Sequence, residues 1–119
     1  MASDISDLQK RIREFVDERD WDQFHNPKDL ALSLILESAE VLEHFQWKND
    51  AEMADYAVNH KDDIGEELAD VLYWTLLLAN KLKIDLSDAF KAKMLINEAK
   101  YPIEKAKGSH KKYTELAGE

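Results

Sequence analysis

Two pairs of acidic residues repeat one spacing in this sequence of 119 residues. Glu37 and Glu40 are three positions apart, and so are Glu67 and Asp70. On an α-helix, residues three apart are neighbours on one face, so each pair would present two carboxylates side by side. Such pairs are also common on solvent-exposed faces. Here, however, both pairs share their faces with apolar residues: Leu30, Leu34, Val41, Ile64, Val71 and Trp74.

Acidic side chains on the inward side of a helix indicate a bound cation. Burying an unpaired carboxylate is costly, and four that face each other would raise one another's pKa. A divalent cation relieves both effects, and ligands that are all oxygens suit Mg²⁺ or Mn²⁺. Mg²⁺ held this way keeps positions open for water and phosphate, where it polarises the phosphoryl group and helps to make hydroxide. The sequence therefore predicts hydrolysis of a phosphate anhydride. It does not decide whether Glu37 or Glu40 would accept the proton from water.

A di-iron bundle is the obvious competing interpretation of these acids. That chemistry uses Glu-x-x-His on two helices. No histidine lies three residues after a glutamate in this sequence, and His44 follows Glu40 by four positions and stands beside Glu43. Without imidazole ligands at the required spacing, the sequence disfavours iron.

Aromatic residues on either side of the first acidic pair could stack on a nucleobase, at about 1–3 kcal/mol each. Trp21, Phe24 and His25 precede the pair, and Trp47 follows it. Phe24 and Trp47 could equally be ordinary core residues, whereas the polar loop around His25 favours contact with a ligand or water. Trp74, one turn after the last acid, could line the pocket or only pack.

Asn97 and Lys100 share a helical face near the end of the chain. A lysine near an acidic site could neutralise a polyphosphate. Alternatively, Lys100 is a solvated residue at a helix end, where it favours the helix dipole.

Helices must position these residues, because the sequence has only three Gly and two Pro and its apolar residues recur at helical spacing. The expected helices are 5–16 capped by Ser3 or Asp4, 27–47 capped by Asn26, 51–58, 62–82, and a last one capped by Ser87 that ends before Tyr101. The helix over 62–82 is apolar almost all round, so we expect a second subunit to cover part of it. We expect one domain over 1–119, with about 109–119 as a flexible tail.

Composition and charge narrow the choice of partners. The formal net charge is −9, from 25 Asp and Glu against 16 Lys and Arg, which disfavours polymeric nucleic acid. The sequence has no cysteine and therefore no disulfide bonds, as is usual for cytoplasmic proteins. The first residues lack the features of a signal peptide, and no apolar stretch reaches the roughly 20 residues of a membrane span. We expect no membrane partner.

The sequence resembles the MazG-like, all-α NTP pyrophosphatase superfamily, and in particular its dCTP pyrophosphatase branch, from about Phe15 to Gly108. The superfamily pattern E-x-x-E followed by E-x-x-D matches the four acids. Three further runs look like signatures of the branch: 18–25 (ERDWDQFH), 45–47 (FQW) and 97–102 (NEAKYP). Two positions depart from the pattern. Ser38-Ala39 replaces a common apolar–Gly pair, and Trp74 stands where a tyrosine is frequent, which leaves the preference for sugar and base open.

The resemblance implies a four-helix bundle of the MazG-like type that assembles as a homodimer or homotetramer, with sites between subunits. It also implies Mg²⁺-dependent cleavage between the α- and β-phosphates of a nucleoside triphosphate of the dCTP type. Such cleavage would cleanse the nucleotide pool. It assigns Trp21, His25 and Trp47 to the base or sugar, and Asn97, Lys100 and Tyr101 to the phosphates. The alternative is a non-catalytic helical oligomer that binds nucleotide or a partner and keeps the acids as structure.

Overall fold

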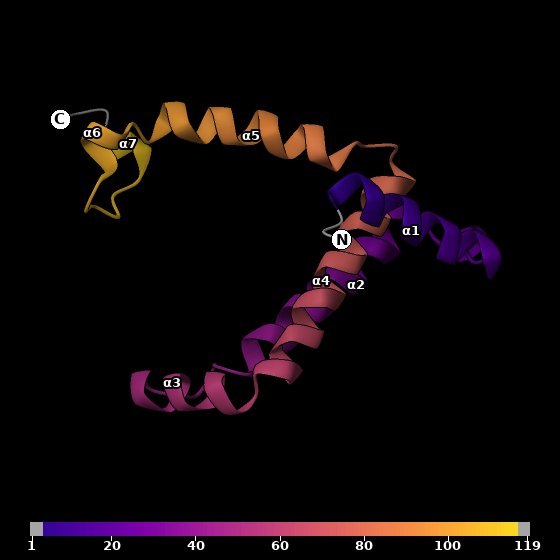
Figure 1. The fold of residues 1–119 in the computed structure, drawn as a ribbon, viewed down its shortest axis with the longest axis horizontal. Helices are drawn as coiled ribbons and strands as arrows, with labels where there is room; N and C mark the ends of the chain where they lie inside the picture. Colours follow the sequence, from indigo (N-terminus) through magenta and orange to yellow (C-terminus); the bar gives the residue numbers. More distant parts are fainter. Residues whose placement is uncertain (1–3, 117–119) are drawn as a thin grey trace. The chain divides into compact units, whose positions relative to one another are not determined.

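Helices carry most of the chain in the computed structural model, which describes residues 4–116 (Figure 1). Among the described residues there is no strand, so the expected all-α class is confirmed. None of the described helices has both the length and the hydrophobicity needed to cross a membrane. The elements are α1 (Ile5–Glu18), the short 3₁₀ helix η1 (Asp22–Phe24), α2 (Pro27–Glu43), α3 (Asp50–Asn59), α4 (Lys61–Lys81), α5 (Leu86–Lys100), α6 (Ile103–Ala106) and α7 (Tyr113–Leu116).

Side-chain caps explain where the first three α-helices begin. The Asp4 carboxylate accepts a hydrogen bond from the backbone of the first turn of α1, as expected for one of the two predicted caps. Asn26 caps α2, with Pro27 in its first turn. Asn49 and Glu52 form a reciprocal capping box at the start of α3. Each cap satisfies backbone N–H groups that have no partner within the helix.

Two predicted boundaries differ from the structure. The cap of α5 is Asp85, which accepts from the backbone of Asp88 at 3.1 Å, and Ser87 already lies inside the helix. α2 ends at Glu43, four residues before the predicted Trp47, because tight turns replace helical bonding over residues 44–47. The predicted flexible tail includes the helical turn α7. Ser3 and residues 117–119 lie outside the described range.

The helices fall into two units, Met1–Ile84 with α1 to α4 and Asp85–Glu119 with α5 to α7. In the first unit, α4 packs along α2 and also contacts α1 and α3 (Figure 1). Its core is a cluster of Val16, Leu30 and Leu77, one from each of α1, α2 and α4. A pair of amides ties α1 to the end of α4: Gln9 donates to Asn80 at 3.0 Å, and Asn80 donates to the backbone of Gln9 at 2.9 Å.

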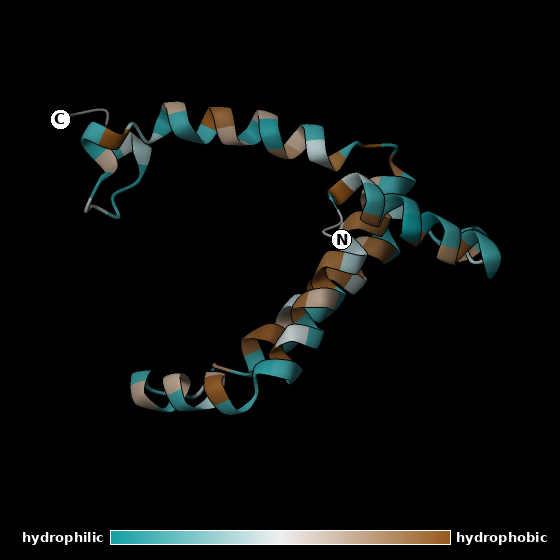
Figure 2. Ribbon diagram, viewed as in Figure 1, coloured by the Kyte–Doolittle hydropathy of each residue, from teal (hydrophilic) through white to brown (hydrophobic). Residues whose placement is uncertain are grey.

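Hydrophobic residues run along α2 and α4 (Figure 2), and several of them are exposed outside this core. Near the end of α4, Leu76 and Leu77 are buried, whereas Leu68 and Leu72 are 53% and 40% exposed. Within this chain, burial of the apolar residues of α4 is therefore confined to the end of the helix. The exposed apolar residues of the two helices are Leu32, Ile35, Leu36, Leu42, Leu68 and Leu72.

In the second unit, the last helical turn packs back on the end of α5. Leu116 is 1% exposed. The Lys100 ammonium lies 4.5 Å from the centre of the Tyr113 ring, and Tyr101 meets that ring edge-on at 6.2 Å. These contacts place Tyr113 beside the end of α5.

Candidate functional site

Packing of α2 along α4 brings acidic residues from both helices together. Glu37, Glu67 and Asp70 each offer a carboxylate oxygen within 4.8 Å of the others. The side chains of Glu37 and Glu67 are half-buried, and Asp70 is exposed. Glu40 lies outside that triad of oxygens, but its side chain is close enough to Glu67 to raise the pKa of that carboxyl. The two predicted pairs therefore meet across the helix interface.

The crowding of these acids raises two of their pKa values. A hydrogen bond with Glu40, followed by burial and the nearby charges of Glu40, Glu37 and Asp70, raises the pKa of Glu67 to about 7. Burial, followed by a hydrogen bond and charge repulsion from Glu40 and repulsion from Asp70, raises the pKa of Glu37. A hydrogen bond from the Trp74 side chain opposes that rise. Without a cation, the cluster therefore holds protons that isolated carboxyls would release.

The donor set of this cluster fits a divalent cation. One oxygen of Glu37 and one of Glu67 are buried without a hydrogen-bond partner. A buried carboxylate oxygen with no partner carries an uncompensated desolvation cost, which a cation would remove. The ligand atoms are all carboxylate oxygens, as Mg²⁺ and Mn²⁺ prefer. These residues can therefore hold a hard divalent cation.

His44 borders this cluster, a place that the sequence-based interpretation did not give it. Its Nε2 atom lies 3.9 Å from Glu67 Oε1, and its Nδ1 atom lies 2.7 Å from the Tyr56 hydroxyl. The spacing from Glu40 was a usable signal, because residues four apart share a helical face. The contact with Tyr56 depends on the packing of α3, and no local pattern indicated it.

For Trp74, the sequence left open whether the side chain lines the pocket or only packs, and the structure shows both kinds of neighbour. It packs against the core cluster of Val16, Leu30 and Leu77. Its side chain also lies near Glu37, where it lowers the pKa of that carboxyl. The indole therefore links the core to the acidic cluster.

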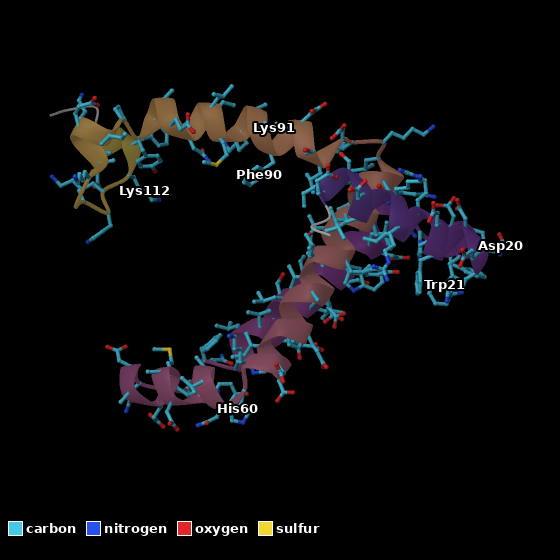
Figure 3. The ribbon with its side chains drawn as sticks, in the orientation of Figure 1. Asp20, Trp21, His60, Phe90, Lys91 and Lys112 are labelled. Atoms are coloured by element: carbon cyan, nitrogen blue, oxygen red, sulfur yellow. The ribbon has the colours of Figure 1, made fainter. Side chains whose placement is uncertain are left out.

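The aromatic residues predicted for the base lie in two separate places. Trp21 is 41% exposed, close to Asp20 beyond the end of α1 (Figure 3), and it meets the Phe15 ring edge-on at 5.6 Å. His25 directly precedes the cap of α2 and is half-buried, with a buried Nδ1 atom that has no partner. Trp47, beyond the other end of α2, is 87% exposed. Phe24 is also exposed, so the alternative that Phe24 and Trp47 are core residues of this chain is wrong.

The length of α2 separates these two groups. A helix of 17 residues is about 25 Å long. Trp21 and Trp47 lie beyond its opposite ends, so they cannot stack on the same base within one chain. A single chain therefore does not bring both tryptophans to one base, whereas the sequence analysis expected sites between subunits.

Three residues predicted to contact phosphate lie in the second unit. Asn97 and Lys100 are on α5, where both are half-buried, and Tyr101 is the C-cap. The backbone N–H of Tyr101 donates to the carbonyl of Asn97 at 2.9 Å. The ammonium of Lys100 sits over the Tyr113 ring, so this lysine is not a freely solvated residue at a helix end.

Comparisons with known proteins agree on one family. A family model described as the MazG-like family matches residues 32–116. dCTP pyrophosphatase 1 from Rattus norvegicus is 42% identical over 114 residues, which cover 94% of this chain and 67% of that protein. The Homo sapiens protein of the same name is 41% identical with the same coverage. A crystal structure of a pyrophosphatase from Archaeoglobus fulgidus superposes with a TM-score of 0.76 and 40% identity, covering 86% of this chain and 95% of that one.

Proposed function

The chain belongs to the MazG-like family, and we propose that it hydrolyses nucleoside triphosphates to nucleoside monophosphate and pyrophosphate. The observation that carries this proposal is the cluster of acids between α2 and α4, in which Glu67 has a pKa of about 7. Relatives named dCTP pyrophosphatase 1 and a solved pyrophosphatase support the same chemistry. Removal of unwanted triphosphates would cleanse the nucleotide pool of the cytoplasm, where these substrates are found.

We propose Glu37, Glu40, Glu67 and Asp70 as the ligands of Mg²⁺, with Mn²⁺ as a substitute. When bound, the cation would supply Lewis-acid activation of the phosphoryl group and of a water molecule. Either Glu37 or Glu40 would accept the proton from that water. Trp74, which lies near Glu37 and lowers its pKa, would help to hold that carboxylate in place.

The proposed substrate contacts follow from the family resemblance. Trp21, His25 and Trp47 would contact the base and sugar. Asn97, Lys100 and Tyr101 would contact the phosphates, with Lys100 balancing the charge that develops on the pyrophosphate leaving group. The relatives make dCTP the first substrate to test.

We propose that the active protein is a homodimer or a homotetramer. The exposed apolar residues of α2 and α4 support this assembly, since burial against a second copy would remove them from water. The separation of Trp21 from Trp47 also supports it. Two chains could supply one tryptophan each to the same base, whereas one chain cannot.

The experiment that tests the function is a panel of nucleoside triphosphates incubated with the protein, with Mg²⁺ or with EDTA. We expect pyrophosphate only with Mg²⁺, and none from the Glu40→Gln variant. The matched control is Glu66→Gln, because Glu66 is an exposed acid next to Glu67 that lies outside the cluster. Binding of a triphosphate by the wild type without release of pyrophosphate would instead support the non-catalytic alternative.

A further inference from the structure

We propose that His44 and Tyr56 form a positioning pair that holds Glu67 in place for the divalent cation. This inference rests on the proposed metal-dependent function. Neither residue would be a metal ligand, and each would act through the next: Tyr56 on His44, and His44 on Glu67. The pair would give α3, which contributes no carboxylate to the cluster, a part in the site.

The first step is the contact between His44 and Glu67. The closest approach, between His44 Nε2 and Glu67 Oε1, is 3.9 Å, which is beyond hydrogen-bond length. His44 Nε2 and Glu67 Oε2 are both buried and without hydrogen-bond partners. A buried donor and a buried acceptor on neighbouring side chains lower their desolvation cost by pairing. A shift of about 1 Å in the flexible Glu67 side chain would bring the two groups to hydrogen-bond length.

The second step is the choice of imidazole tautomer. A neutral imidazole has one donor nitrogen and one acceptor nitrogen. The Tyr56 hydroxyl, 2.7 Å from His44 Nδ1, can donate to that nitrogen, which leaves the proton on Nε2. The opposite tautomer would direct a lone pair at the Glu67 carboxylate. The geometry therefore favours an Nε2–H group directed at Glu67, the same kind of outer partner that orients ligands in other metal sites.

The third step is the support of Tyr56 itself. Its ring stacks on His60 with centres 3.9 Å apart and an angle of 11° between the planes. The Lys48 ammonium lies 4.2 Å from the centre of the ring, and the Phe45 ring approaches at 6.4 Å. His60 joins α3 to α4, as Figure 3 shows. Contacts on the ring thus fix the hydroxyl that faces His44.

The test is the affinity of the metal alone, measured by titration of the protein with Mn²⁺ and detection of free Mn²⁺ by electron paramagnetic resonance. Loss of an outer partner typically weakens metal binding by about 10- to 100-fold. We expect His44→Leu to lose this much and Tyr56→Phe to lose less in the same direction. Tyr56→Phe keeps the ring and its contacts, so it still tests the proposal if His44→Leu does not fold. His44→Gln, whose amide can place a donor near the position of Nε2, should regain most of the affinity.

A double variant separates positioning from ordinary packing. If Tyr56 acts through His44, adding Tyr56→Phe to His44→Leu should weaken Mn²⁺ binding no further. The control is His110→Leu, an exposed histidine in the second unit, which should bind Mn²⁺ like the wild type. Unchanged affinity in both single variants, or fully additive losses in the double variant, would overturn the proposal.

Failure of the proposed function would be visible in the same preparations. A wild type that binds Mn²⁺ but releases no pyrophosphate from any triphosphate would refute the function, while the ranking of the variants would still decide the role of His44 and Tyr56. A wild type that binds no Mn²⁺ would overturn both proposals. A wild type that binds Mn²⁺ and releases pyrophosphate, with variants ranked as expected, would support both.

Discussion

The raised pKa of Glu67 predicts that metal binding weakens as the pH falls below neutrality. A divalent cation competes with the proton for this carboxylate. With a pKa of about 7, Glu67 is about nine-tenths ionised at pH 8 and about one-tenth ionised at pH 6. Affinity for Mn²⁺ should therefore fall about tenfold between pH 8 and pH 6 through this residue alone. Glu37, whose pKa is also raised, would make the dependence steeper.

The same shift predicts how the stability of the metal-free protein depends on pH. The folded pKa of Glu67 lies above its ordinary value of 4.5. Between these two values the folded state binds more protons than the unfolded state, so the free energy of unfolding decreases as the pH rises. The protein in EDTA should thus melt at a lower temperature at pH 7.5 than at pH 5.5, through this group. Glu67→Gln should reduce that dependence.

Titration with Mn²⁺ at pH 6, 7 and 8 measures the first effect, and thermal melting in EDTA measures the second. Glu66→Gln serves as the control for both, because it removes a neighbouring negative charge without touching the cluster. Glu67→Gln should bind Mn²⁺ more weakly than the wild type and with a shallower pH dependence. A wild-type affinity that stays constant from pH 6 to pH 8 would refute the reasoning that the acids share protons when the cation is absent.

Three further predictions concern the acids, the assembly and the base. The Glu40→Gln and Asp70→Asn variants should each lose turnover. In EDTA each should melt at a higher temperature than the wild type, because the substitution removes a charge that repels Glu67. Near-normal Mg²⁺-dependent activity in both variants would refute the proposal that these acids bind the metal. Light scattering at micromolar concentration should give a dimer or tetramer, and a folded particle of one chain mass would contradict this. Trp21→Ala should raise KM by the equivalent of about 1–3 kcal/mol and reduce the selectivity between bases. If KM and the ranking of bases are both unchanged, Trp21 does not contact the base.

Features that are local in sequence could be predicted well. Asn26 followed by Pro27 indicated the start of α2, and the structure has its cap there. The two acidic pairs were identified by spacing and by the apolar residues around them, and the packing of α2 along α4 brings acids from both pairs together. Such features depend on the periodicity and capping of single helices, which neighbouring residues determine.

Other features depend on choices that local sequence leaves open. Asp85 and Ser87 are both good N-cap residues, and their order along the chain does not decide between them. The contact of His44 with Tyr56 requires the chain after α2 to bring α3 to the end of that helix, which no periodicity encodes. The exposure of Trp47 is a further case, since an aromatic residue at a helix end can face either the core or a partner.

Hydrolysis in ¹⁸O-labelled water, followed by mass analysis of the products, tests the central claim most directly. The claim is that water attacks the α-phosphorus beside the acids of α2 and α4, while pyrophosphate leaves. We expect the label in the nucleoside monophosphate and none in the pyrophosphate. Label only in pyrophosphate would mean attack at the β-phosphorus, and release of nucleoside diphosphate with orthophosphate would mean attack at the γ end; either result would contradict the account.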